Sequence, residues 1–197
     1  MILTSFAALL VLLGILALFF FLVVVLPVRI LAYAYRKIGV RPRYMFLVLL
    51  LTLVGSLVNI PLFSVGSVVV AINVGGALVP LLLSLYLFAH LRLRGRMLIG
   101  TVIVAAIVHS LAQIVPGAGI AVPWLVPPLA AAGVSLLLSF RQAPPVAYVA
   151  GSMGTLIGAD LLNLHRLAEI GAPVVSIGGA GTFDGVFLTG IIAGLLV

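Results

Sequence analysis

The sequence predicts an all-α polytopic membrane protein of about seven transmembrane helices, with its N-terminus outside and its C-terminus inside the cell. Of the 197 residues, 65% are hydrophobic and 7% are charged, and the mean hydropathy is +1.49. A water-soluble core cannot absorb that much apolar surface. The apolar runs are continuous rather than alternating, which favours helices over barrel strands in lipid. We therefore expect one multi-pass domain over residues 1–197, located in the cell membrane.

Seven apolar runs have the length expected of spans. They cover residues 2–26, 44–63, 68–91, 97–115, 121–140, 144–164 and 173–197. The first run is too long for the apolar part of a signal peptide, and no basic segment precedes it. We interpret it as a helix that stays in the membrane.

The distribution of basic residues predicts the orientation. Nine of the ten basic residues fall on one side of the predicted spans, and Arg166 alone falls on the other. The nine are Arg29, Arg36, Lys37, Arg41, Arg43, Arg92, Arg94, Arg96 and Arg141. Because loops rich in lysine and arginine stay in the cytoplasm, this side faces inward.

Composition also narrows the partners and cofactors. The chain has no cysteine and three scattered histidines, so we predict no disulfide, no thiolate chemistry, no metal site and no cofactor. The net charge of +7 lies in short loops between apolar runs, which argues against nucleic acid. We expect these inner loops to contact anionic lipid head groups of the bilayer. The substrate is unknown, and a homo-oligomer remains open.

Three predicted spans contain residues that loosen helices. Asn73 precedes a Gly-Gly pair in the third span, and the seventh span opens with Gly178, Gly179 and Gly181; Asn59 lies near the end of the second. Irregular backbone at membrane depth requires cover from protein or a cavity. We therefore predict broken or Gly-rich helices at spans three and seven, with an ordinary kink or close helix contact as the alternative.

The two Gly-rich regions also suggest a weak internal repeat. Leu-Val-Asn at 57–59 followed by Asn-Val-Gly-Gly-Ala at 73–77 is similar to Leu-Leu-Asn at 161–163 followed by Ser-Ile-Gly-Gly-Ala at 176–180. Spans one to three and five to seven would then be parallel copies joined by the fourth. Such a layout of three, one and three helices is similar to that of SWEET-type sugar transporters.

The acidic residues are the strongest candidates for chemistry, because the whole chain has only Asp160, Glu169 and Asp184. An aspartate in lipid costs about 2.5–3.5 kcal/mol, so it normally faces protein or water. Asn163 shares a helix side with Asp160, where it would orient the carboxyl group. The alternative is that Asp184 merely begins the last helix, where backbone amides favour a carboxylate, and that Asp160 ends the sixth span.

Two aspartates on adjacent helices can share one proton and activate water for peptide hydrolysis. Asp160 and Asp184 are therefore the predicted catalytic pair. The rival prediction is a small-molecule or ion transporter that binds its substrate at the broken helices, through Asn59, Asn73, Asn163, Gly178, Gly179 and Gly181. A third alternative is a non-catalytic subunit whose glycine faces contact a partner helix.

The segments 150–160 and 176–185 resemble an uncharacterised family of bacterial and archaeal membrane proteins, domain of unknown function 1614. This resemblance covers most of the chain and implies membership without an activity. The aspartates also give a looser likeness to intramembrane aspartyl proteases of the presenilin and prepilin-peptidase type, which carry one aspartate on each of two helices. That likeness implies catalytic roles for Asp160, after Ile-Gly-Ala, and for Asp184, after Gly-Ala-Gly-Thr-Phe.

Overall fold

The computed structural model describes residues 2–66, 68–117, 119–179 and 185–197, with side chains except at 2–10 and 168. Contacts divide the chain into two compact units, Met1–Tyr33 and Ala34–Val197. Each unit is described by itself. The prediction of a single membrane domain over residues 1–197 remains a prediction.

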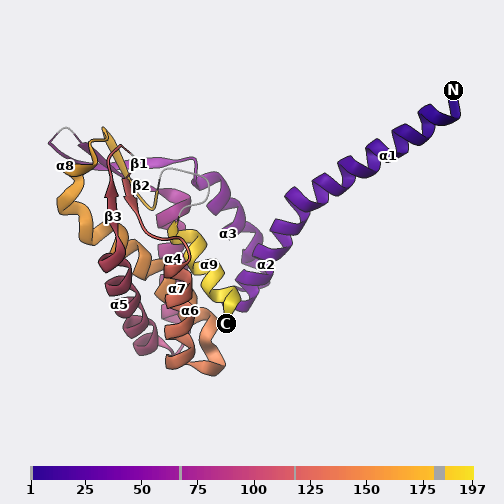
Figure 1. Ribbon diagram of the computed structural model, residues 1–197. Helices are drawn as coiled ribbons and strands as arrows, with labels where there is room; N and C mark the ends of the chain where they lie inside the picture. Colours follow the sequence, from indigo (N-terminus) through magenta and orange to yellow (C-terminus); the bar gives the residue numbers. More distant parts are fainter. Residues whose placement is uncertain (1, 67, 118, 180–184) are drawn as a thin grey trace. The chain divides into compact units, whose positions relative to one another are not determined.

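The first unit is helical throughout its described residues. Helix α1 (Ile2–Phe20) continues as a π-helical turn, Phe21–Val25, and then as α2 (Leu26–Lys37) (Figure 1). The residues of α2 from Ala34 on belong to the second unit. The stretch Val11–Lys37 has a mean hydropathy of 3.1 and is long enough to cross a membrane. The predicted first span is therefore confirmed as a long apolar helix.

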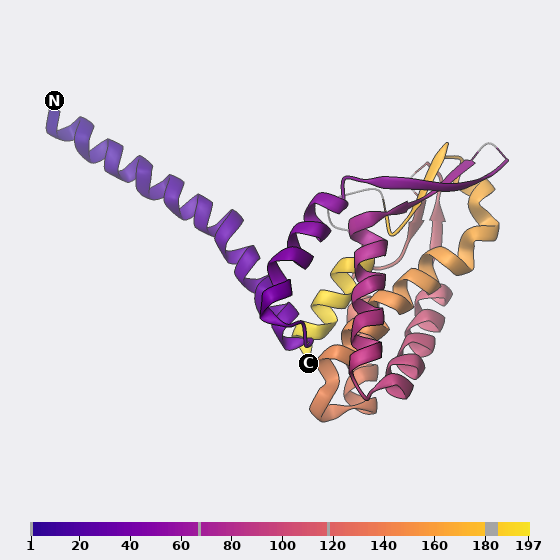
Figure 2. The ribbon, with the colours of Figure 1, turned by 180° about the vertical axis from the view of Figure 1, so that it is seen from behind.

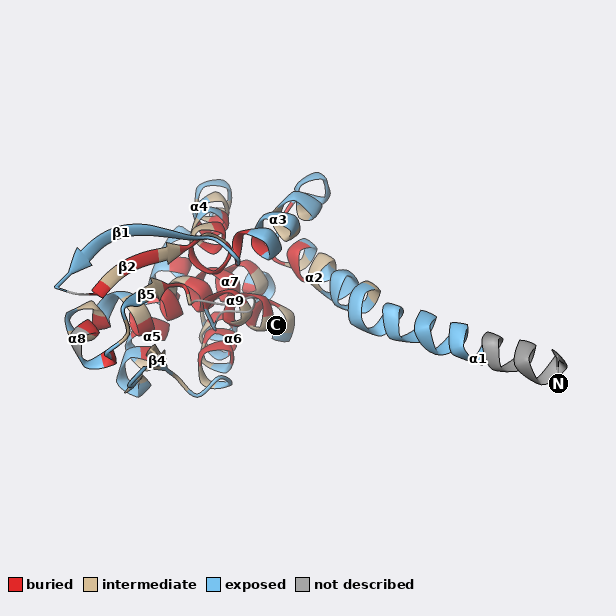
Figure 3. Ribbon diagram, turned by 90° about the horizontal axis from the view of Figure 1, so that it is seen from above, coloured by how far each residue is buried: buried red, intermediate tan, exposed pale blue. Residues whose placement is uncertain are grey.

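The second unit is a helical bundle built around α7. Its larger helices are α3 (Pro42–Gly55), α4 (Val79–His90), α5 (Arg94–Leu111), α6 (Val126–Leu138), α7 (Ala143–Thr155) and α9 (Gly185–Leu196). Helix α7 contacts α4, α5, α6 and α9, and most of its residues are buried (Figure 3). Small residues such as Ala131, Ala147 and Ala150 fill the contact, which lets the helices approach closely.

Strands cover one end of this bundle, which we call the sheet end (Figure 2). In the described sheet, β2 (Val68–Asn73) lies between β1 (Asn59–Val65), to which it is antiparallel, and β5 (Val174–Ile177), to which it is parallel. A short hairpin, β3 (Gln113–Val115) and β4 (Gly119–Ala121), follows α5. The opposite end, which we call the basic end, carries residues 36–43, 92–96 and 139–142.

The strands make the prediction of an all-α fold wrong, although the chain is mostly helical. The predicted span 44–63 ends its helix at Gly55 and continues as β1; the spans 68–91 and 173–197 each begin with a strand. Apolar runs without alternation are compatible with a buried strand or a buried helix, so hydrophobicity alone cannot separate them. The β-branched residues Val68, Val69, Val70 and Ile72 favour the strand.

Several helices depart from α geometry, as predicted for span three. After β2, residues Val74–Leu78 form a π-helical turn that contains Gly75 and Gly76 and leads into α4. A second π-helical turn, η4 (Leu156–Asp160), follows α7, and a 3-10 helix, η5 (Leu161–Arg166), follows η4. The short helices η3 (Phe140–Gln142) and α8 (Leu167–Ile170) complete these connections. For span seven, Gly178 and Gly179 have positive φ and are not helical.

The described part of the chain contains three helices long and apolar enough to cross a membrane: Val11–Lys37, Arg94–Leu111 and Phe140–Arg166. Shorter apolar helices occupy Pro42–Gly55, Val74–His90, Val126–Leu138 and Gly185–Leu196. Each of the predicted spans therefore contains an apolar helix. Together these helices indicate a membrane protein.

Candidate functional site

A cavity of about 260 Å³ lies at the sheet end of the bundle. Residues of β4, of the start of α6, of the α7–η4 segment and of α9 surround it. The lining residues are Ile120, Ala121, Val122, Trp124, Pro127, Thr155, Ala159, Asp160, Gly185, Val186, Leu188, Thr189 and Ile192. Most are apolar, so a polar group in this cavity interacts in a medium of low dielectric constant.

Asp160 places a carboxylate in this cavity. It is the last residue of the turn η4 and is half-buried. The backbone N–H of Gly178 donates to Asp160 Oδ2 over 2.8 Å. Because Gly178 directly follows β5, this hydrogen bond ties the sheet to the helix that carries the aspartate.

The π-helical turn brings Thr155 and Asp160 to the same cavity. Two residues five apart in an α-helix point about 140° away from each other. In η4 the N–H of Leu161 bonds to the carbonyl of Leu156, five residues earlier, as well as to that of Ile157, so this turn is wider than an α-helical one and brings the directions of residues five apart closer together. Without this turn, a helix that directed Thr155 into the cavity would direct Asp160 away from it.

The Thr155 hydroxyl has no hydrogen-bond partner among the described residues, and the side chain is 5% exposed. A buried polar group left without a partner costs about 1–3 kcal/mol. Thr155 lines the same cavity as Asp160, although its hydroxyl oxygen is itself buried, with less than 1 Å² of accessible surface. Thr189 also lines the cavity, and Trp124 stands at its rim with 74% of its surface exposed.

Two residues predicted for the site, Asp184 and Gly181, lie outside the described residues. Gly185, the neighbour of Asp184 in the sequence, lines the cavity. Asp160 therefore lines the cavity, as does Gly185, the first described residue after the gap.

Asn59 and Asn73 do not line this cavity and instead hold the sheet together. The Asn73 amide donates to Asn59 Oδ1 over 3.1 Å and to the Ser56 carbonyl over 2.9 Å, while Asn73 Oδ1 accepts from the Gly76 N–H. The Ser176 hydroxyl donates to Asn59 Oδ1 over 2.6 Å. These bonds join β1, β2 and β5 and cap the turn before α4.

Asn163 supports the π-helical turn. Its amide nitrogen lies 3.1 Å from the Gly158 carbonyl, 2.9 Å from the Ala159 carbonyl and 3.3 Å from His109 Nδ1. Asn163 therefore donates to backbone carbonyls close to Asp160. Helix spacing had instead predicted that it orients the Asp160 carboxyl group. In the described residues, no three histidine or acidic side chains come close enough to hold a metal ion.

Sequence reasoning found Asp160 but missed Thr155, Thr189 and Trp124. A threonine in an apolar helix usually bonds to its own backbone, so its type gives no signal. The five-residue spacing between Thr155 and Asp160 becomes informative only once the π-helical turn is known.

A protein-family model described as a protein of unknown function, DUF1614, matches residues 44–196. The chain belongs to this family. The DUF1614 match runs from α3 to α9, so it includes the sheet, the cavity and the π-helical turns, and it excludes α1. Neither the curated proteins nor the solved structures gave a match.

Proposed function

We propose that this DUF1614 protein is a membrane-embedded hydrolase of the aspartyl type, with Asp160 and Asp184 as the catalytic pair. One observation supports the proposal above the others: Asp160 and Gly185, which directly follows Asp184, line the same cavity. The proposal extends to seven spans with the N-terminus outside, which puts the cavity on the outer side.

The pair would act by sharing one proton. The ionised carboxylate removes a proton from a water molecule, and the resulting hydroxyl attacks the peptide carbonyl carbon. The protonated carboxyl group donates to the carbonyl oxygen, so that a neutral tetrahedral diol forms. The protonated carboxyl group then donates to the leaving nitrogen while the ionised one takes a proton from a diol hydroxyl, so the C–N bond breaks, an amine and a carboxylic acid form, and the pair again holds one shared proton.

The cavity supports this chemistry in two respects. Its apolar lining favours one neutral and one ionised carboxyl group over two ionised ones, because neighbouring like charges repel strongly where the dielectric constant is low. Its volume of about 260 Å³ leaves room for the attacking water molecule at Asp160.

The test uses the purified full chain and a peptide pool whose cleavage is followed by mass spectrometry. Asp160→Asn and Asp184→Asn should each abolish cleavage, because acid and base are both required, while thermal unfolding in detergent stays close to that of the wild type. Glu169→Gln is the matched control, because Glu169 is exposed and lies outside the cavity. Cleavage that persists in Asp160→Asn would contradict the proposal.

A second candidate function is ion or proton transport, favoured by a cavity that Thr155, Asp160 and Thr189 all line. Hydroxyl and carboxylate oxygens are suitable ligands for a hard cation or for hydronium. Under this alternative, proteoliposomes would take up ²²Na⁺ or acidify, and Asp160→Asn would remove that uptake without any peptide cleavage by the wild type.

A further inference from the structure

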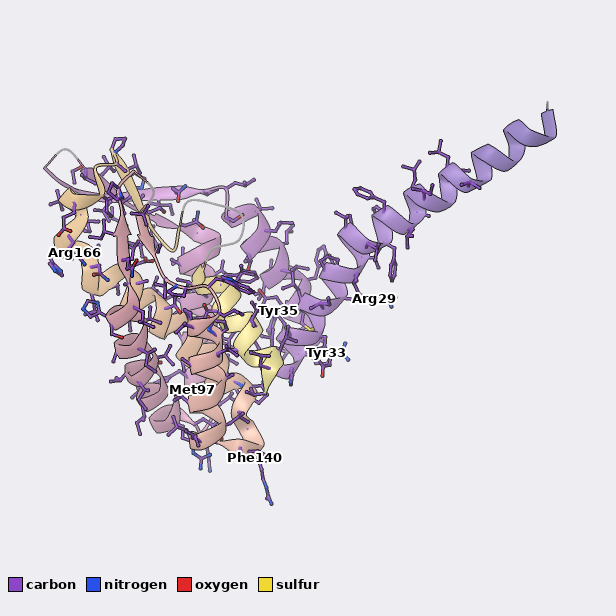
Figure 4. The ribbon with its side chains drawn as sticks, in the orientation of Figure 1. Arg29, Tyr33, Tyr35, Met97, Phe140 and Arg166 are labelled. Carbon is purple, nitrogen blue, oxygen red and sulfur yellow. The ribbon has the colours of Figure 1, made fainter. Side chains whose placement is uncertain are left out.

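The basic end of the second unit carries positive charge that its own acidic side chains do not neutralise. The acidic residues that the structure describes, Asp160 and Glu169, both belong to the sheet-end connections. The salt bridge found within the described ranges joins Arg166 to Glu169, also at that end. Arg92, Arg94, Arg96 and Arg141 belong to residues 92–96 and 139–142 of the basic end, where Figure 4 labels Phe140.

The position of Arg94 and Arg96 adds to the excess of positive charge at the basic end. Helix α5 begins at Arg94, so both arginines lie in its first turn. The N-terminus of a helix carries a partial positive charge, which makes a cation there unfavourable and an anion favourable. The Arg94 guanidinium donates to the carbonyls of Phe88 and Ala89, at the negative C-terminal end of α4, and so is partly compensated.

A hollow of about 450 Å³ lies beside Arg96, lined by Leu138, Ser139, Phe140, Arg141 and Gln142. Arg96 Nη1 donates to the Ser139 hydroxyl over 3.0 Å, which holds this guanidinium at the hollow. Arg141 and Gln142 are both exposed. Two arginines and a glutamine therefore line a space large enough for a phosphate group, which guanidinium groups bind well.

Apolar side chains beside the hollow are directed outward. Phe140 is 81% exposed and Leu137 is 89% exposed, at the point where α6 ends. Leu98, two residues after Arg96, is 56% exposed on α5. Such side chains require contact with hydrocarbon, whereas the arginines next to them require an anion.

We infer that this hollow binds the head group of an anionic phospholipid, with the phosphate between Arg96 and Arg141 and the acyl chains along Leu137 and Phe140. The inference is independent of the proposed hydrolase activity, because the hollow and the cavity share no residue. An inorganic anion would satisfy the arginines but would leave the apolar side chains unaccounted for.

The test is a titration of the purified full chain, in a neutral detergent, with phosphatidylglycerol or phosphatidylcholine, followed by native mass spectrometry. Phosphatidylglycerol should bind at least about tenfold more tightly than phosphatidylcholine. Arg141→Gln should weaken phosphatidylglycerol binding about fivefold, because one arginine at a membrane surface contributes about that much to the affinity. Arg166→Gln, which removes an arginine at the sheet end, is the matched control and should change the affinity less than twofold.

A second variant tests the lipid part of the site. Phe140→Ser keeps the charge and should still weaken phosphatidylglycerol binding, and millimolar inorganic phosphate should not displace the lipid. Equal binding of the two lipids, equal effects of Arg141→Gln and Arg166→Gln, or displacement by inorganic phosphate would each overturn the inference.

Discussion

At the scale of single residues, the Thr155 side chain helps to distinguish a ligand-binding site from an ordinary helix end. A threonine that served only helix packing would have its hydroxyl bonded to a neighbouring carbonyl. The Thr155 hydroxyl instead has no partner among the described residues, and Thr155 lines the cavity that Asp160 also lines. The cost of this arrangement to stability is the reason to assign it a role in function.

Replacement of Thr155 by valine tests that role. Valine keeps the shape and removes the hydroxyl, so we expect the free energy of unfolding to stay equal or to rise by about 1 kcal/mol. Peptide cleavage or ion uptake, whichever the wild type performs, should fall, and Thr155→Ser should restore it. Chemical denaturation of both variants in detergent measures the first effect. A clear loss of stability in Thr155→Val would mean that the hydroxyl has a structural partner.

Glu169 offers a direct measurement of electrostatics, because it is the only glutamate in the chain. The Arg166 guanidinium donates to both carboxylate oxygens, over 3.1 and 3.0 Å, and this hydrogen bonding lowers the pKa of Glu169 below its ordinary value. Since the pKa is lower in the folded state, the pair stabilises the fold at neutral pH, and this contribution is lost as the pH falls through the lowered pKa.

Selective ¹³C-glutamate labelling should give a single carboxyl signal whose titration midpoint lies below about 4.3, the ordinary value for glutamate. Arg166→Gln should move the midpoint upward. An unchanged midpoint in that variant would show that the ion pair does not form in solution.

At the scale of elements, the contact between α5 and the α7–η4 segment depends on two glycines. Gly154 and Gly158 are four residues apart and both meet α5 closely. A Cβ atom at Gly154 would lie 2.7 Å from the Val104 side chain, and one at Gly158 would lie 2.5 Å from the Ala105 carbonyl oxygen. The second contact is with backbone, which cannot rotate away.

We therefore expect Gly158→Ala to cost about 1–3 kcal/mol, the range for an added carbon in a filled interior. Gly133→Ala is the matched control within helix α6, because an added Cβ there meets nothing within 4 Å. It should instead stabilise the chain by about 0.4–1 kcal/mol. Thermal unfolding of the two variants in the same detergent measures the difference, and equal midpoints would argue against the close contact.

The elements also show what sequence reasoning can and cannot reach. Apolar helices were predictable because lipid leaves few alternatives for long apolar runs. The strands were not, because β1, β2 and β5 consist of residues as hydrophobic as those of the helices, and a parallel pairing such as that of β2 with β5 joins segments about one hundred residues apart. Asp160 was predictable because acidic residues are rare in apolar runs. That it lines the same cavity as Thr155 depends on a π-helical turn.

At the scale of the whole molecule, the proposed orientation can be tested without background labelling, because the chain has no cysteine. Single cysteines introduced at residue 165 should react with an impermeant maleimide in intact cells. Cysteines at residues 36 and 94 should react only after the cells are permeabilised, because basic loops remain inside. Labelling at residue 94 in intact cells would reverse the orientation and would put the cavity on the cytoplasmic side.

The short helices of the second unit have a consequence for the surrounding lipid. Helices α3, α6 and α9 contain 14, 13 and 12 residues, so they are about 18–21 Å long. The hydrocarbon core of a typical bilayer is about 30 Å thick, and exposed strand edges are excluded from it. The second unit should therefore thin the bilayer around itself, and its thermal stability should be greatest in lipids with short acyl chains. A maximum at ordinary or longer chain length would show that the hydrophobic mismatch is relieved in another way.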